Sequence, residues 1–163
     1  MKAYTKKLTT LAVTVAAAMV LSFIESQIPA ALPVPGVKLG LANIAVVFAL
    51  YKLGTYQAAL VSVVRVVLMA MLFGNALGLI YSLAGAVISL ASMLLIKNVI
   101  KMHAAGVSIA GGVMHNAAQI AVASIVMETA VIIYYLPWLI ISGTLSGIAI
   151  GALGYQLVKR IKL

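Results

Sequence analysis

The stretch that decides the fold is residues 56–96, YQAALVSVVRVVLMAMLFGNALGLIYSLAGAVISLASMLLI, in which only Gly74 and Asn75 separate two apolar runs. Each run is close to the ~20 residues that a helix needs to cross a hydrocarbon core of about 30 Å. Because lipid offers no hydrogen-bond partners, the backbone of each run must satisfy its own polar groups as a helix. The stretch therefore predicts two antiparallel transmembrane helices joined by a tight turn.

Similar apolar runs lie on both sides of this hairpin, in a chain of 163 residues that is 65% hydrophobic and only 8% charged. A soluble domain of this length has too little interior to bury so much apolar surface. The runs do not alternate apolar with polar residues, which argues against an outer-membrane barrel. We predict an all-α polytopic membrane bundle of about six transmembrane helices, forming a single domain over 1–163. The expected spans are 8–24, 37–53, 56–73, 76–96, 106–128 and 138–158.

Two segments leave alternatives open. The first run follows Lys2, Lys6 and Lys7, which is also the arrangement of a cleaved signal peptide. Its apolar length from Leu8 to Ile24 exceeds that of a typical signal peptide, which favours a retained membrane helix. The stretch Thr129–Pro137 either extends the fifth span or forms a short re-entrant turn before the sixth.

The basic residues predict the orientation of the bundle. Arg65 falls within a span and Lys38 lies alone on one side, whereas the others share the opposite side. Those others are Lys2, Lys6, Lys7, Lys52, Lys97, Lys101, Lys159, Arg160 and Lys162. Cytoplasmic loops carry the excess of Lys and Arg, so we expect a multi-pass protein of the cytoplasmic membrane with both termini in the cytoplasm. The formal charge of +9 does not indicate nucleic-acid binding, because these residues sit at helix ends and form no stripe with aromatic residues.

Arg65 is the first candidate for a binding residue. It lies about ten residues into its span and therefore near the middle of the membrane, at 1.5 Å per residue. An unpaired cation is costly there, so its side chain should face the bundle interior and meet an anion or carbonyl groups. The functional interpretation is recognition of a solute. The structural interpretation is pairing with backbone carbonyls or with Glu128.

Further polar residues are expected at comparable or more outward depths on other helices. His115 and Gln119 share a helical face at spacing i, i+4, and Asn116 adjoins them. Asn43 and Tyr81 lie on the second and fourth spans. Such residues either line a polar cavity or hold helices together by hydrogen bonds. We predict a substrate-binding site formed by Asn43, Arg65, Tyr81, His115, Asn116 and Gln119.

The loop Glu25–Gly36 is expected to cover this site from outside. Proline fixes φ and removes a hydrogen-bond donor, so the prolines predict a shaped cap rather than a flexible linker. The proposed lid residues are Glu25, Pro29, Pro33, Pro35 and Lys38. Nearby aromatic residues, Tyr134, Tyr135 and Trp138, are typical of the belt at a membrane interface, with ligand stacking as the alternative.

Small residues form two rows that would let helices approach closely. Gly143, Gly147 and Gly151 follow one face of the sixth span, where packing within the monomer is the expected role. Ala12 and Ala16 lie four residues apart on the first span. Packing within the bundle and docking of a partner protein are both open for the alanines.

Several chemistries find no support in the residues. The chain has no cysteine and no aspartate, and its only acids are Glu25 and Glu128. No phosphate-binding G-x-x-x-x-G-K-[ST] motif is present, and no acidic cluster exists to hold Mg²⁺ on a diphosphate. We therefore expect neither a metal site nor a cofactor, and we expect that the chain is not an enzyme.

Several motifs resemble the Gx transporter family, which is often labelled heptaprenyl diphosphate synthase component I. The resemblance covers nearly the whole chain and implies similarity to the substrate-binding S components of energy-coupling factor (ECF) transporters. The motifs are Glu25-Ser-Gln-Ile-Pro29, Leu32-Pro-Val-Pro-Gly-Val-Lys-Leu-Gly-Leu-Ala-Asn43, Leu72-Phe-Gly74, Tyr81-Ser-Leu-Ala-Gly85, Gly106-Val-Ser-Ile109, Gly111-Gly-Val-Met-His-Asn116 with Gln119, and Tyr134-Tyr-Leu-Pro137.

The resemblance implies a six-helix protein whose outward site is capped by the loop after the first helix. It also implies that Ala12 and Ala16, which match an Ala-x-x-x-Ala motif, dock a transmembrane coupling subunit that carries two ATPase subunits. Our first hypothesis is thus a solute-binding subunit of an ECF-type importer. Arg65 and Lys38 favour an anionic solute, vitamin-like or related to isoprenoids or quinones. The alternatives are a non-catalytic accessory subunit of isoprenoid or quinone synthesis, and a small channel.

Overall fold

The computed structural model describes residues 2–27 and 40–161, and every regular element in these ranges is helical. The α-helices are α1 (Lys2–Gln27), α2 (Asn43–Lys52), α3 (Thr55–Phe73), α4 (Ala76–Leu95), α5 (Ala104–Val126) and α6 (Leu136–Arg160). A π-helical turn, η1 (Ile96–Ile100), continues α4, and a 3₁₀ helix, η2 (Ala130–Tyr135), precedes α6. The predicted all-α membrane bundle is confirmed, and five of the described helices are long and apolar enough to cross a membrane.

The exception is α2, which has ten residues over Asn43–Lys52. At 1.5 Å per residue it is about 15 Å long, roughly half of a hydrocarbon core. The predicted span 37–53 was wrong about where this helix begins. Gly40 has φ +75°, and the Asn43 N–H donates to the Gly40 carbonyl at 2.8 Å, so a turn directly precedes the helix. Apolar composition predicted the length of the run, but it could not predict this turn.

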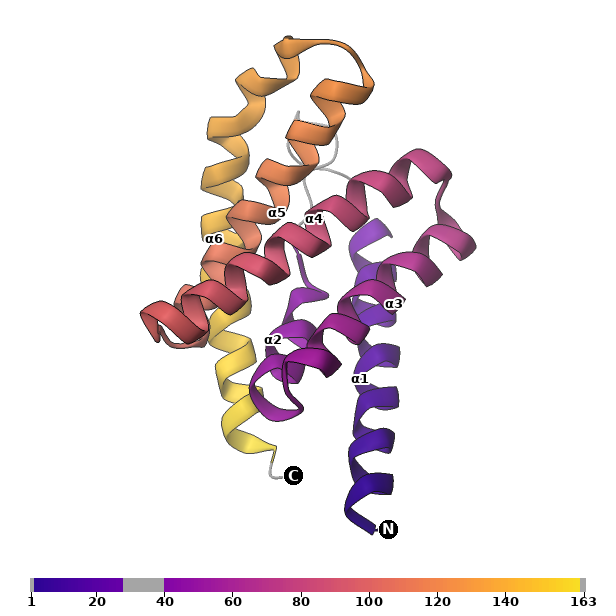
Figure 1. Cartoon of the computed structure of the whole chain (residues 1–163), viewed down its shortest axis with the longest axis vertical. Helices are drawn as coiled ribbons and strands as arrows, with labels where there is room; N and C mark the ends of the chain where they lie inside the picture. Colours follow the sequence, from indigo (N-terminus) through magenta and orange to yellow (C-terminus); the bar gives the residue numbers. More distant parts are fainter. Residues whose placement is uncertain (1, 28–39, 162–163) are drawn as a thin grey trace.

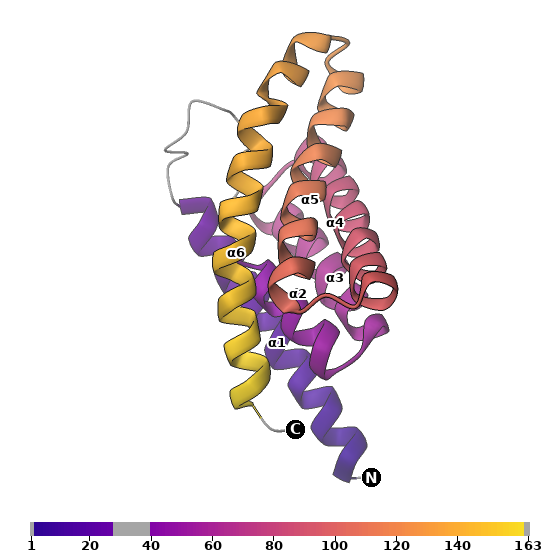
Figure 2. The same ribbon diagram turned by 90° about the vertical axis from the view of Figure 1, so that its left-hand side faces the viewer.

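The two described ends of the chain lie at the same end of the bundle (Figure 1). α5 and α6 form a long antiparallel hairpin that extends beyond the other helices at the opposite end, as both views show (Figures 1 and 2). α3 and α4 form the second hairpin, and α1 packs against α2 and α3. This arrangement agrees with the tight turn expected at Gly74 and Asn75.

α2 forms the centre of the bundle even though it is short. It contacts α1, α3, α5 and α6, and all its residues from Asn43 to Leu50 are buried. Val46, Val47 and Leu50 are essentially inaccessible, and they share a core with Ala18 of α1 and Met93 of α4. The helix has no polar face apart from its ends, so its sequence suits burial on all sides.

The tightest packing joins α5 to α6. A Cβ added at Gly147 would lie 2.6 Å from the Cα of Ile109, and one at Gly151 would lie 2.5 Å from the Cα of Ala105. At Gly143 the nearest atoms belong to the backbone of Gly112. These glycines therefore let two backbones touch, which confirms their predicted role in packing within the monomer.

The connection between α5 and α6 differs from both expected forms. Glu128 adopts a left-handed conformation at φ 49°, and the Thr129 hydroxyl accepts a hydrogen bond from the Val131 N–H at 3.4 Å. The six residues of η2 then lead directly into α6, with Pro137 in its first turn, where a missing N–H costs nothing. The segment Thr129–Pro137 thus extends α6 rather than α5.

Lys97 lies in η1, the π-helical turn that continues α4, and joins this turn to α2. Its Nζ donates to the Leu50 carbonyl at 2.7 Å and lies 4.8 Å from the centre of the Tyr51 ring. A cation at the carboxyl end of α2 satisfies carbonyls that the helix leaves unpaired. The Tyr51 hydroxyl in turn donates to the Met102 carbonyl at 3.3 Å, which ties the α4–α5 connection to the same place.

Candidate functional site

Arg65 lies near the middle of α3 and is partly buried. Its Nη1 donates to the Ser22 hydroxyl of α1 at 3.4 Å, a long hydrogen bond. Its Nε is buried and has no hydrogen-bond partner among the described residues. A guanidinium has five N–H donors and cannot lose its proton in a protein, so this side chain keeps its full charge with donor capacity unused.

Glu25 supplies the negative charge near Arg65. The Ser22 and Glu25 side chains share a face of α1 at spacing i, i+3, and Glu25 interacts coulombically with Arg65. The same carboxylate accepts a hydrogen bond from the Gly40 N–H, just before α2. Glu128, the other acid, lies exposed in the turn after α5. Within residues 2–27 and 40–161, the polar neighbours of Arg65 are thus Ser22 and Glu25, and Glu128 of the structural interpretation lies elsewhere.

We call Ser22, Glu25, Gly40 and Arg65 the Arg65 cluster. Contacts between α1 and α3 hold its two sides together. Near the carboxyl ends of these helices the rings of Phe23 and Phe73 are 5.0 Å apart, centre to centre. The cluster joins three elements, since Glu25 reaches the backbone before α2 while Arg65 reaches from α3 to α1.

Asn43 adjoins the cluster through Gly40. Its side chain is buried, and its Nδ2 would lie 3.7 Å from a Cβ added at Gly40. The same added atom would lie 3.3 Å from Ile150 of α6, so α6 also approaches this point. The positive φ of Gly40 suits glycine, which brings the backbone N–H to Glu25 without a side chain in between.

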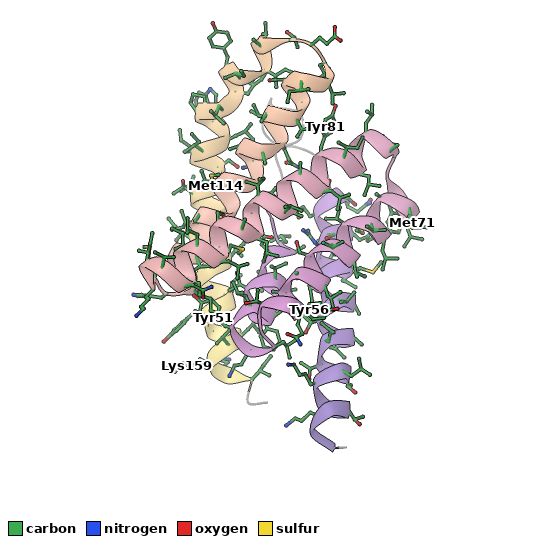
Figure 3. The ribbon with its side chains drawn as sticks, viewed as in Figure 1. Tyr51, Tyr56, Met71, Tyr81, Met114 and Lys159 are labelled. Atoms are coloured by element: carbon green, nitrogen blue, oxygen red, sulfur yellow. The ribbon has the colours of Figure 1, made fainter. Side chains whose placement is uncertain are left out.

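The predicted residues on α4 and α5 form a second group. His115 and Gln119 face Gly85 of α4, where an added Cβ would lie 2.8 Å from His115 Cε1 and 3.1 Å from Gln119 Cγ. Tyr81 lies one helical turn before Gly85, is partly buried, and sits in the half of the bundle away from both described ends (Figure 3). Gly85 thus makes room for the imidazole between two closely packed helices.

Asn116 faces a different neighbour. Its buried Nδ2 donates to the Leu139 carbonyl of α6 at 3.1 Å. This bond is of the kind that joins membrane helices, with a value of about 0.6–2 kcal/mol. The three polar residues predicted together on α5 are therefore split, with His115 and Gln119 toward α4 and Asn116 toward α6.

Two other predicted features can be placed only in part. Of the lid, Glu25 belongs to the Arg65 cluster, whereas Pro29, Pro33, Pro35 and Lys38 lie outside the described residues. Ala12 and Ala16 are both exposed on α1, on the surface that does not pack against the bundle. Ala18, only two residues later, is fully buried.

Sequence reasoning missed Ser22 and Gly40. A signal for Ser22 was its spacing of three from Glu25, which places both on one helical face. The role of Gly40 as a donor to Glu25 depends on the path of the chain between α1 and α2, and no local pattern encodes it.

The arrangement suits anion binding more than bond-making chemistry. In residues 2–27 and 40–161, no three side chains among His, Asp and Glu are grouped so that they could hold a metal ion. What the Arg65 cluster offers is a permanent cation, an unused N–H donor and a hydroxyl. An arginine presents such donors as a planar fork that matches a carboxylate or phosphate.

Comparison with known proteins places the chain in a family. The family model for heptaprenyl diphosphate synthase component I matches residues 14–157, which is most of the chain. The chain therefore belongs to this family, also described as the Gx transporter family, and it is a membrane protein. Comparisons with curated proteins and with solved structures found no significant match.

Proposed function

We propose that this member of the heptaprenyl diphosphate synthase component I family is the solute-binding subunit of an ATP-driven importer of the ECF type. The observation that carries the proposal is Arg65, a charged side chain in the middle of a membrane helix, whose buried Nε has no hydrogen-bond partner among residues 2–27 and 40–161. Ionisable residues within membrane spans are expensive and usually mark a path or site for a solute. Arg65 would receive an anionic group, with Asn43 close to the same cluster.

The remaining site residues would recognise the rest of the solute. Tyr81, His115 and Gln119 belong to the α4–α5 group, and the Asn116 side chain on α5 donates a hydrogen bond to α6. With both termini in the cytoplasm, as the distribution of Lys and Arg favours, this half of the bundle faces outward. A solute would enter from outside, beneath the segment that connects α1 to α2.

Energy for import would come from partners. The sequence has no phosphate-binding loop for ATP. The exposed Ala12 and Ala16 offer a flat strip on α1 where a second helix can approach closely. We assign this strip to a transmembrane coupling subunit, which would itself carry two ATPase subunits.

The proposal is tested by reconstitution. The protein purified alone should carry a small anionic molecule, identified by mass spectrometry, and should show no ATP-dependent uptake in liposomes. Uptake of that molecule should appear when the coupling and ATPase subunits are added with internal ATP. ATPase activity of the pure chain, or ATP-driven uptake without partners, would refute the proposal.

A second candidate is a non-catalytic membrane subunit of isoprenoid or quinone synthesis, which the printed description of the family favours. It predicts that the chain co-purifies with a soluble prenyl synthase and changes its rate or product length. The importer proposal predicts that the same synthase works equally well with membranes that contain or lack this chain.

A further inference from the structure

Charge balance around Arg65 is the feature that leads beyond the proposed function. The chain contains two acids, and only Glu25 is an electrostatic neighbour of Arg65. The Glu25 carboxylate lies one helical turn from Ser22, which itself contacts the guanidinium. An arginine that stays charged in a low-dielectric site requires such compensation whether or not a solute is present.

We propose that Glu25 is the resident anion of the Arg65 site, and that a solute carboxylate binds by taking its place. This inference rests on the proposed function and specifies the class of solute as carboxylate-bearing. Glu25 does not depend on Arg65 alone, because it also accepts a hydrogen bond from the Gly40 N–H. Glu25 can therefore move away from Arg65 and keep the Gly40 N–H as a partner.

The unused donor shows why exchange is favourable. The Nε of Arg65 has no hydrogen-bond partner in the part of the chain that the structure describes, although Ser22 accepts from Nη1. A free carboxylate is not tethered to α1, so it can align both oxygens with the guanidinium fork and satisfy Nε as well. A buried donor that gains its missing bond recovers the cost of its desolvation. The Glu25 carboxylate thus balances the charge of Arg65 but leaves the Nε donor available to a solute.

Chemical rescue tests this assignment on the purified protein in detergent. Glu25→Ala removes the resident carboxylate and leaves room for sodium acetate or formate, the probes used. We expect acetate to raise the Tm of Glu25→Ala by about 3 °C or more relative to chloride at equal ionic strength, in a saturable way. The parent should need at least about tenfold more acetate for the same response, because it must first displace Glu25.

Two controls separate this result from general effects of salt. Glu128→Ala removes the other acid, which is exposed, and should show no acetate response beyond that of the parent. Glu25→Ala with Arg65→Met removes both charges and should also lose the response. A Glu25→Ala protein that is indifferent to acetate, or a double variant that is rescued equally, would overturn the proposal.

A second measurement covers the case in which Glu25→Ala does not fold. Glu25→Gln keeps the size of the side chain and an oxygen that can accept from Gly40, but it loses the charge. We expect Glu25→Gln to have a lower Tm than Glu25→Gln with Arg65→Met, because the second change removes an uncompensated cation. The opposite order would overturn the inference.

Neither experiment involves transport, so the two proposals can fail separately. ATP-driven uptake without acetate rescue would contradict this inference alone, and rescue without uptake would contradict only the proposed function.

Discussion

The two sides of the bundle are built in different ways. On one side α5 and α6 are in backbone contact at Gly143, Gly147 and Gly151, and a single added carbon would collide with the neighbouring main chain. On the other side α1 buries little of its surface, with Thr14 and Ala18 as its buried residues in the described part of the chain. Side chains such as Ser22 and Phe23 connect it to α3.

We interpret this difference as a division between a supporting side and the proposed binding side. Backbone-to-backbone packing leaves no room for a charged group with its partners, so the α5–α6 seam serves as a rigid framework. A helix held by a few side chains can accommodate a guanidinium, a carboxylate and a solute between itself and its neighbours. Regions that bind and move have fewer buried contacts than the framework that carries them.

The largest expected effect comes from breaking the framework. Gly147→Leu would push a branched side chain into the backbone at Ile109, where even a Cβ would lie 2.6 Å from Cα. Overpacking costs about 1–3 kcal/mol when side chains can adjust, and we expect more than about 3 kcal/mol here because backbone must move. Thermal unfolding in detergent measures the loss.

The matched control for this change is Gly106→Ala, where the atom in the way is the terminal methyl of Met102, a flexible side chain. We expect less than about 1 kcal/mol for this variant. Equal stability of Gly147→Leu and the parent would mean that α5 and α6 are not in backbone contact.

The next effect concerns binding rather than folding. Arg65→Met should leave the bundle folded, because it removes a buried charge and Glu25 keeps its bond to Gly40. It should lower affinity for the co-purified solute by about 100-fold or more, since charge-assisted bonds of about 1.5–3 kcal/mol each are lost. Arg65→Lys keeps the charge but loses the planar fork, so we expect about a tenfold loss.

Solute affinity and Tm are measured on the same samples of both variants. An Arg65→Met protein that unfolds would show that the cation is structural, and one that binds as well as the parent would remove Arg65 from the site. Either result would erase the proposed distinction between a binding side and a framework side.

Substitutions on the exposed surface of α1 should have a smaller effect on the stability of the protein. Ala12 and Ala16 are exposed, so changing both to Trp should change the free energy of unfolding by less than about 0.5 kcal/mol. It should nevertheless block assembly with the coupling subunits, which a pull-down from co-expressing cells detects, while solute binding survives. Unchanged pull-down would place the docking surface elsewhere.

Ala18→Trp provides the contrast on the same helix. Ala18 is fully buried against α2 and the core, so a Trp there should destabilise the protein strongly. Similar Tm values for the Ala18 and Ala12/Ala16 variants would contradict the described orientation of α1.

Sequence patterns predicted the framework better than the site. Hydrophobic length predicted where α3, α4, α5 and α6 lie, because a membrane requires continuous apolar helices, whereas α1 begins at Lys2, well before its predicted span 8–24. The glycine row on α6 was likewise correct, since closely spaced small residues have few other uses in a membrane helix. Periodicity could not show that α2 begins only after a turn at Gly40, nor that Asn116 and His115 face different helices.

The Arg65 cluster shows why the site was harder to predict. Arg65 was conspicuous as a charge within an apolar run, but its neighbours Glu25 and Gly40 are distant in sequence. Their meeting depends on how α1 and α2 approach each other, which is a property of tertiary packing. Sequence thus indicated which residue needed a partner without indicating which partner it has.

The last prediction concerns the orientation of the bundle in the membrane. Its two substitutions should leave folding and binding unchanged. Ser26 lies exposed at the end of α1, and His103 lies exposed between α4 and α5. Since the chain has no cysteine, Ser26→Cys and His103→Cys each introduce a single thiol. The excess of Lys and Arg near His103 predicts that an impermeant maleimide added to intact cells labels Ser26→Cys, and labels His103→Cys only after the membrane is opened. Labelling of both thiols in intact cells would contradict the model in which the described chain ends lie together in the cytoplasm and the Arg65 cluster faces outward.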